Sequence, residues 1–310
     1  MSITSFMGSF RVAVTLLLVS LTCLSMARAA EISSPESGGS RRPLSGILIE
    51  GPIVKGDFEK FEYLALGSDR DPVWLASPGG DLFEAMRIGA LVRRMKLSVQ
   101  APDANQKAWS VMIHVNDPRN NVCASACFFI YAAGVERFGD TLGIHRPRIT
   151  EEDLRNISMD QAASGLLSAN EVASAYLRKM GIPHSIIERM NSTKPRDIQW
   201  LGEEDVESLS GYIPEYQDWL DAKCPWGINV PDAPKRCEDC SLDELVSRWS
   251  ERADAENFEC KTALMDTERE AARHEILDEY VKTGRLKEMV EEQRARDANR
   301  KEPKGTGAKG

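Results

Sequence analysis

The sequence predicts a layered α/β domain followed by a helical, cysteine-containing C-terminal extension. Short apolar runs at residues 46–49, 73–76 and 97–99 alternate with longer stretches of helical period, as in α/β layers. Four of the seven cysteines lie after residue 220. Beyond Leu242 the chain is rich in charged residues and poor in strand formers, so we expect one or two long charged helices there.

The composition is that of a globular chain without a nucleic-acid partner. Of the 310 residues, 42% are hydrophobic and 28% are charged, which excludes a disordered or multi-pass membrane protein. The formal net charge is −9, from 39 Lys and Arg against 48 Asp and Glu. Phosphate binding needs a basic surface, so this charge argues against nucleic acid as a partner.

The N-terminal segment predicts export. Residues 1–29 hold no acidic residue, and Arg11 is followed by an apolar run over 12–21 and by small residues that end at Ala29. This pattern indicates a secretory signal peptide cut near Ala29, and hence a periplasmic or secreted protein. A retained membrane anchor is the alternative, but the apolar run is shorter than the ~20 residues that span a bilayer.

Shifts in composition predict the remaining boundaries. Residues 30–44 are rich in Ser, Gly, Pro and Arg and predict a linker, so the folded part should begin near Leu44. The α/β domain is expected over 45–215, the cysteine-containing extension over 216–262, and a charged helix with a disordered tail over 263–310.

The first strand-to-helix junction carries two adjacent glycines. Residues 73–76 predict a buried strand, and Asp81 followed by Glu84 is typical of the start of a helix. Ser77-Pro78-Gly79-Gly80 lies between them. Paired glycines let the backbone approach a ligand and direct N–H groups at it, although such a turn also occurs without function.

The second junction places a serine before a buried helix. Ser125 lies within Cys123-Ala124-Ser125-Ala126-Cys127, and residues 128–134 are apolar on every side, as in a core helix. A helix N-terminus favours an oxyanion, so the Ser125 hydroxyl is a candidate nucleophile, with a simple helix cap as the alternative. His145 is the candidate base, because an intervening strand would bring it back to that hydroxyl, with a purely structural histidine as the alternative.

In this order the three blocks resemble the Clp protease proteolytic subunit and its crotonase-like relatives, and are most similar to the exported branch. The resemblance implies a ClpP/crotonase-like layered β-β-α domain. It implies Ser125 as the nucleophile, His145 as the general base, and the N–H groups of Gly80 and Ala126 as the oxyanion hole. Asp197 is the candidate third member of the triad, offset by one residue from the family spacing, and an ordinary surface aspartate is the equal alternative.

The resemblance implies an exported serine hydrolase, a peptidase that needs neither a metal nor a cofactor. A peptide or protein would be its substrate, and homo-oligomers are implied. The alternative is a non-catalytic Clp-like envelope scaffold or peptide-binding protein, which uses the same groove or binds a protein partner through its C-terminal helices. A serine–lysine dyad ranks lower, because no lysine lies in a matching motif.

The cysteines outside the signal peptide are candidates for disulfides, because an even number in an exported chain favours pairing. They are Cys123, Cys127, Cys224, Cys237, Cys240 and Cys260. A bond between the first two would rigidify the turn around Ser125. The last four allow three pairings, and a zinc site that includes Cys237-x-x-Cys240 is the less favoured alternative.

Overall fold

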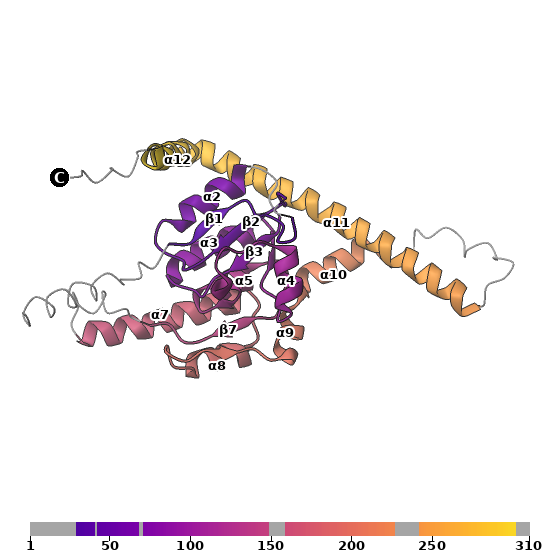
Figure 1. Cartoon of the computed structure of the whole chain (residues 1–310), viewed down its shortest axis with the longest axis horizontal. Coiled ribbons are helices and arrows are strands. Elements are labelled where there is room, and N and C mark those ends of the chain that lie inside the picture. Colours follow the sequence, from indigo (N-terminus) through magenta and orange to yellow (C-terminus); the bar gives the residue numbers. More distant parts are fainter. Residues whose placement is uncertain (1–28, 41, 68–70, 149–158, 227–241, 302–310) are drawn as a thin grey trace, which may run out of the picture.

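The structure is a computed structural model that describes residues 29–40, 42–67, 71–148, 159–226 and 242–301 (Figure 1). The predicted signal peptide, Cys237, Cys240 and the predicted C-terminal tail lie outside these residues, apart from Ala29 at the signal's end. In the described part, none of the helices combines the length and the apolar character needed to cross a membrane.

A six-stranded mixed sheet forms the centre of the domain, with the order β1-β2-β3-β4-β6-β9. The four inner strands are parallel and the two edge strands are antiparallel to their neighbours. The strands are β1 (Glu31–Ser33), β2 (Ile47–Glu50), β3 (Val73–Ala76), β4 (Ser98–Gln100), β6 (Glu136–Phe138) and β9 (Gly211–Tyr212). The apolar runs of β2 and β3 are buried on both faces, as parallel strands covered by helices should be.

The predicted linker is wrong at its start, because the domain begins at Ala30 and not near Leu44. Residues 31–33 form β1, which pairs with β2 so that Ile32 lies opposite Ile49. Ala30 is only 3% exposed and belongs to the core. The backbone groups at the edge of β2 need hydrogen-bond partners, and this segment supplies them although its composition is that of a linker.

A smaller three-stranded sheet carries the second junction. It consists of β5 (Cys123–Ala124), β7 (Leu142–Ile144) and β8 (Gln199–Trp200), in the order β5-β7-β8. β5 is parallel to β7, and β8 is antiparallel to it. An isolated parallel bridge between Ser77 and Cys123 joins the end of β3 to the start of β5. The two predicted junctions therefore meet in space.

Ten α-helices lie in the described part of the chain, which also holds a 3₁₀ helix over Pro118–Asn120. They are α2 (Asp57–Gly67), α3 (Leu82–Arg94), α4 (Gln106–Met112), α5 (Ala126–Ala133), α7 (Met159–Lys179), α8 (His184–Ser192), α9 (Glu203–Leu209), α10 (Pro214–Lys223), α11 (Leu242–Thr283) and α12 (Arg285–Lys301). All eight residues of α5 are buried, as predicted. α5 packs closely against α3 at Gly89, where an added Cβ would lie 3.0 Å from the Phe129 carbonyl oxygen.

Two arginines cap the C-terminal end of α5. The guanidinium of Arg93 donates to the carbonyls of Ala133 (2.7 Å) and Ala132 (3.2 Å), and that of Arg137 donates to Ala132 (2.7 Å) and to Met180 at the end of α7 (2.7 Å). The unpaired carbonyls and negative dipoles of both helix ends are thereby satisfied. Burial, with Arg93 nearby, lowers the pKa of Arg137 to about 10.

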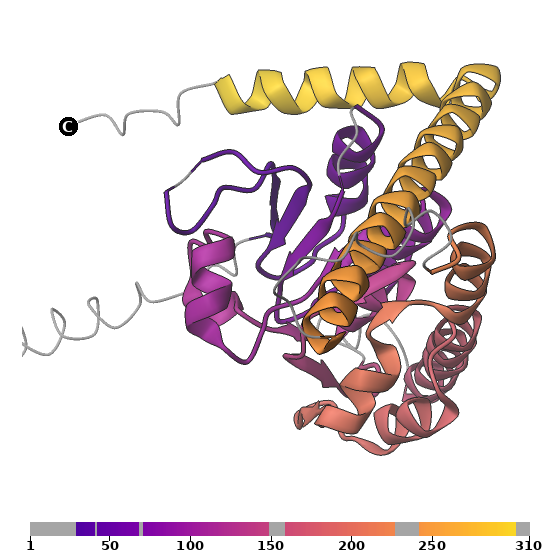
Figure 2. The ribbon, with the colours of Figure 1, turned by 90° about the vertical axis from the view of Figure 1, so that its right-hand side faces the viewer.

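The C-terminal helices pack on the domain as well as facing solvent (Figures 1 and 2). Met265 and Ile276 of α11 are fully buried, and Met289 of α12 is 4% exposed. α11 also crosses the predicted boundary at 262/263 as one helix of 42 residues. That boundary is wrong because no Gly or Pro interrupts residues 242–283, and Gly284, with φ +82°, is the first residue that breaks the helix.

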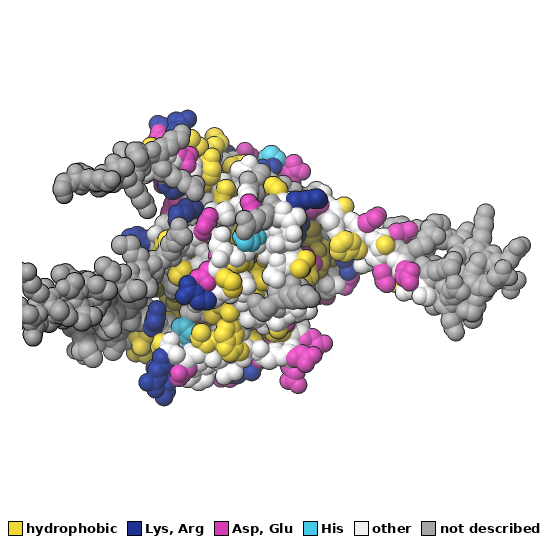
Figure 3. All heavy atoms as spheres, viewed as in Figure 1, with side chains coloured by type: hydrophobic (Ala, Val, Ile, Leu, Met, Phe, Trp, Pro, Cys, Tyr) yellow, Lys and Arg dark blue, Asp and Glu magenta, His cyan; other side chains and the backbone are white. Residues whose placement is uncertain are grey.

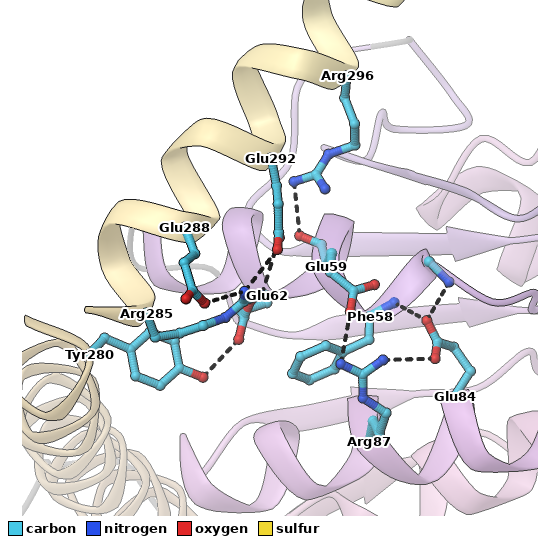
Figure 4. A network of polar contacts seen from close by, with 11 residues as sticks. Phe58, Glu59, Glu62, Glu84, Arg87, Tyr280, Arg285, Glu288, Glu292 and Arg296 are labelled. Carbon is cyan, nitrogen blue, oxygen red and sulfur yellow. Dashed lines mark hydrogen bonds and ion pairs between the residues drawn. The ribbon is translucent and has the colours of Figure 1, made fainter. Parts of the chain in front are cut away.

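Polar contacts fix α12 against α2 (Figure 4). The carboxylate of Glu62, only 1% exposed, accepts a hydrogen bond from the Tyr280 hydroxyl (2.8 Å) and forms an ion pair with Arg285 (2.6 Å). Arg285 also pairs with Glu292 at 2.9 Å. Hydrogen bonds with Glu292 and Glu62 raise the pKa of Arg285 above its ordinary value. The buried carboxylate is thus fully paired, as its burial requires.

The packing of α11 predicts a specific loss of stability. Ile276→Ala should lower the free energy of unfolding by about 2–5 kcal/mol, because it removes a buried side chain and leaves a cavity. Val281→Ala on the same helix is the control, since Val281 is 63% exposed. Urea unfolding measures both variants. Equal effects of the two substitutions would show that α11 is not docked through this face.

Candidate functional site

Ser125 has a strained backbone between β5 and α5. Its φ is +56° and its ψ is −122°, and Lys96 is the other non-glycine residue with a positive φ in the described chain. The conformation is held because the Ser125 N–H donates to the Gly143 carbonyl (2.9 Å) and the Phe128 N–H donates to the Ser125 carbonyl (3.1 Å). Such strain in a residue with a Cβ persists only where its surroundings enforce it, often at functional sites.

The Ser125 hydroxyl does not act as a helix cap. It makes no capping hydrogen bond with α5, and among the described residues it has no other hydrogen-bond partner. The alternative role as a cap is therefore not observed. The hydroxyl lies half-buried at the positive end of a buried helix dipole, where a developing negative charge is favoured.

The glycine turn lies directly against this serine. A Cβ added to Gly79, whose φ is +102°, would be 2.6 Å from the Ser125 Cβ and 2.9 Å from the Ala126 nitrogen. Gly80 has a φ of +142°, and an added Cβ there would lie 2.1 Å from the Ile53 carbonyl oxygen. Neither position has room for a side chain, so the turn requires glycine at both. The structure thus brings the first two predicted blocks together.

Two backbone N–H groups at this contact have no acceptor within the described chain. They belong to Gly80 and to Ala126, the first residue of α5. The turn is held by its neighbours instead, since the Ile53 N–H donates to the Gly79 carbonyl and the Asp81 N–H to the Ile53 carbonyl, both at 2.8 Å. An oxyanion hole needs such unpaired N–H donors, and here one lies on each of the two junctions that meet at Ser125.

His145 lies at the end of the strand next to Ser125. β5 and β7 are parallel, with Ala124 opposite Gly143, so Ser125 and His145 both follow the carboxyl ends of neighbouring strands. The His145 Nδ1 is 2.8 Å from the Arg146 carbonyl oxygen. A carbonyl only accepts, so Nδ1 carries the proton and Nε2 of the neutral ring is an acceptor. No hydrogen bond joins the ring to Ser125 in the described structure.

Asp197 is not joined to His145. Its side chain is 59% exposed and lies 4.0 Å from the Arg196 guanidinium. Ile144 is opposite Gln199 in the β7–β8 pair, so continuing this register places Ile198, and not Asp197, across from His145. The Arg146 carbonyl is the hydrogen-bond partner of the imidazole that the structure shows.

The structure pairs four of the candidate cysteines. Cys123 is bonded to Cys127 around Ser125, and Cys224 is bonded to Cys260, which links α10 to α11. Because Cys224 and Cys260 are bonded to each other, neither can be a zinc ligand, as the alternative prediction required. No group of three or more His, Cys, Asp or Glu side chains in the described ranges is placed to hold a metal ion.

A cavity of about 670 Å³ opens beyond the start of β7, at the other end of this strand from His145. Trp200 and the first residues of α9 line it, and neither Ser125 nor His145 does. Sequence reasoning missed this cavity. The signal available was Trp200, an aromatic residue in a short strand that is 45% exposed.

Comparison with known proteins gives a structural likeness and no sequence match. No family model matches the sequence, and no curated protein matches it. Among solved structures, the chain is similar to a ClpP1 mutant from Listeria monocytogenes, with 19% sequence identity and a TM-score of 0.35. The likeness covers 53% of this chain and 85% of that one.

The two disulfides should differ in their effects on stability and on the reactivity of Ser125. In the chain-entropy model, the bridge between Cys123 and Cys127, which closes a short loop, contributes ~2 kcal/mol, and the longer bridge between Cys224 and Cys260 contributes ~4 kcal/mol. Replacing both cysteines of each pair by alanine should therefore cost more stability in the second case. Only the first replacement should change the reactivity of Ser125, measured by labelling with a serine-directed probe. A larger effect of the second pair on labelling would contradict this assignment.

The strain at Ser125 predicts that glycine at this position gives a more stable protein than alanine does. Ser125→Gly should be about 1 kcal/mol more stable than Ser125→Ala, because glycine accepts a positive φ that a Cβ disfavours. Ser168 is an exposed position in the interior of α7, where the sign should reverse, with Ser168→Gly less stable than Ser168→Ala. Thermal unfolding of the four variants measures both differences. The same sign at both positions would mean that Ser125 is unstrained.

Proposed function

We propose that this chain is an exported serine hydrolase that acts on peptides. Ser125 is the nucleophile, His145 is the general base, and the N–H groups of Gly80 and Ala126 form the oxyanion hole. The observation that carries the proposal is the strained Ser125, whose unbonded hydroxyl lies at the N-terminus of a buried helix with the Gly79 turn packed against it.

The proposed reaction is acyl transfer in two steps. His145 Nε2 takes the proton of Ser125, whose oxygen attacks the peptide carbonyl, and the same nitrogen then protonates the departing amine. Water attacks the resulting ester by the same route and regenerates the serine. The N–H groups of Gly80 and Ala126 would hold the oxyanion, and losing one such donor typically costs about 2.7–4 kcal/mol.

The partner of His145 affects the expected rate. The Arg146 carbonyl favours the tautomer that leaves Nε2 free to accept a proton, which is the orienting role of a triad carboxylate. A neutral carbonyl stabilises the imidazolium less than a carboxylate does. We therefore expect reaction with activated acylating probes and slower turnover of ordinary peptides.

Export is supported by the sequence and by the cysteine pairing. The N-terminal segment has the pattern of a signal peptide. The two disulfides suit an oxidising compartment, since such bonds are rare in the cytosol. The location in the periplasm or outside the cell remains part of the proposal.

The second candidate function is a non-catalytic scaffold or peptide-binding protein. It is favoured by the missing hydrogen bond between Ser125 and His145 and by the exposed position of Asp197. A scaffold would retain its binding function in Ser125→Ala, whereas a hydrolase would lose its activity.

Labelling with a fluorophosphonate tests the proposed function. The wild-type chain should form a covalent adduct at Ser125, located by mass spectrometry of the digested protein, and Ser125→Ala should form none. His145→Ala should react roughly a hundredfold more slowly, because it lacks the general base. Ser208→Ala and His184→Ala are the matched controls, since both residues are exposed on other helices.

Each control should label at the wild-type rate. The proposal fails if the folded wild-type chain is not labelled, or if Ser125→Ala is labelled as rapidly as the wild type. Circular dichroism melting shows that each variant is folded before its rate is compared.

A further inference from the structure

The cavity at the start of β7 has carboxylates around an apolar floor. Its volume, about 670 Å³, is in the range of ligand pockets. The residues that line it include Asp140, Thr141, Trp200, Glu203, Val206 and Glu207. No Lys, Arg or His lines this cavity. Figure 3 shows acidic side chains gathered at the lower right of the molecule, over α9.

The carboxylates on the cavity have no cationic partner in the described part of the chain. Glu203 and Glu207 are four residues apart on α9, so they lie on the same helix face, and both are exposed. Neither forms an ion pair with a described residue. Asp140 accepts hydrogen bonds from the Ala104 N–H (2.5 Å) and from the Thr141 hydroxyl (3.1 Å). A bound cation would relieve the repulsion among these three charges.

The apolar lining suits the stem of a long basic side chain. Val206 lies between the two glutamates on α9, and the indole of Trp200 is 45% exposed. Lysine and arginine pack their methylene groups on apolar surface and keep their charge near polar groups. An aromatic face also attracts a cation. An anion, by contrast, would face only negative charges.

An exposed apolar strip connects this cavity with the candidate catalytic residues. Ile198 and Trp200 both lie over Gly143, where an added Cβ would be 2.7 Å from Ile198 Cγ2 and 3.0 Å from Trp200 Cζ3. The carbonyl of Gly143 accepts the Ser125 N–H. Thr141 at the cavity directly precedes β7 and His145 directly follows it, so the two residues are four positions apart, a span of about 13 Å at the usual rise of a strand.

We propose that this cavity binds a lysine or arginine side chain of an extended peptide that crosses Ile198 and Trp200 to reach Ser125. The inference rests on the proposed function only in taking the peptide as a substrate, and binding itself does not need catalysis. The basic residue should lie about four residues from the bond that Ser125 attacks, because an extended peptide has the same rise as a strand.

Peptide binding to Ser125→Ala tests the site without turnover. The probes are fluorescein-labelled peptides of Ala and Ser with one lysine four residues from the centre, on either side, and the same peptides with norleucine in place of lysine. Fluorescence anisotropy measures their affinities. Of the two lysine peptides, the one whose lysine stands on the side that reaches the cavity should bind roughly fivefold to tenfold more tightly than its norleucine counterpart. The gain is modest because partly exposed ion pairs are individually weak.

Charge variants on α9 then locate the preference. Glu203→Gln combined with Glu207→Gln, in the Ser125→Ala background, should abolish the difference between the lysine and norleucine peptides. Glu204→Gln is the matched control, because Glu204 lies on the same helix, is exposed, and does not line the cavity. Trp200→Ala should weaken both peptides, since it removes the apolar strip.

The outcomes separate this proposal from the hydrolase assignment. Equal affinities for the two peptides, no binding of either, or a lysine preference that survives the double glutamine variant would overturn the cationic subsite. If the preference is present but fluorophosphonate does not label the wild type, the subsite stands and the hydrolase assignment is lost. If the wild type is labelled without a lysine preference, the hydrolase assignment stands and the cationic subsite is lost.

Discussion

The buried helix α5 is the constraint on which the rest of the domain depends. Eight residues of backbone run through the core without contact with water, so the unpaired groups at both ends must be satisfied by the fold. Arg93 and Arg137 supply donors to the carbonyl end. At the other end, the Ala126 N–H has no acceptor in the described chain. In the proposed reaction, the oxyanion formed at Ser125 would supply the acceptor that this N–H lacks within the described chain.

The strained serine follows from the same constraint. The chain must pass from β5 into α5 within one residue, and Ser125 takes up the change of direction with a positive φ. The disulfide on either side of it and the Gly79 backbone pressed against its Cβ leave it no alternative path. The bridge between Ser77 and Cys123 connects the two sheets at this point. The site is therefore rigid because three covalent and backbone constraints meet there.

Local patterns predicted the parts of the site that lie within one short segment. The glycine pair, the serine before an apolar helix and the histidine after a strand are each visible in a few consecutive residues. The register that places Ile198 rather than Asp197 across from His145 depends on long-range strand pairing, which sequence spacing does not reveal. β1 was missed for a related reason, because its pairing is decided by the open edge of β2 and its own composition is that of a loop. The cavity needs α9 and β8 to come together, and neither carries a motif.

Helix α11 of the C-terminal extension packs at the opposite end of the parallel strands from the candidate site. Arg269 of α11 donates to the Lys96 carbonyl and pairs with Asp71, and these two residues precede β4 and β3. α11 therefore packs near the amino ends of the parallel strands. The glycine turn follows the carboxyl end of β3, where open α/β sheets bind ligands. Packing of α11 thus stabilises the domain without covering Ser125. A partner bound along α11 would also leave the site around Ser125 accessible.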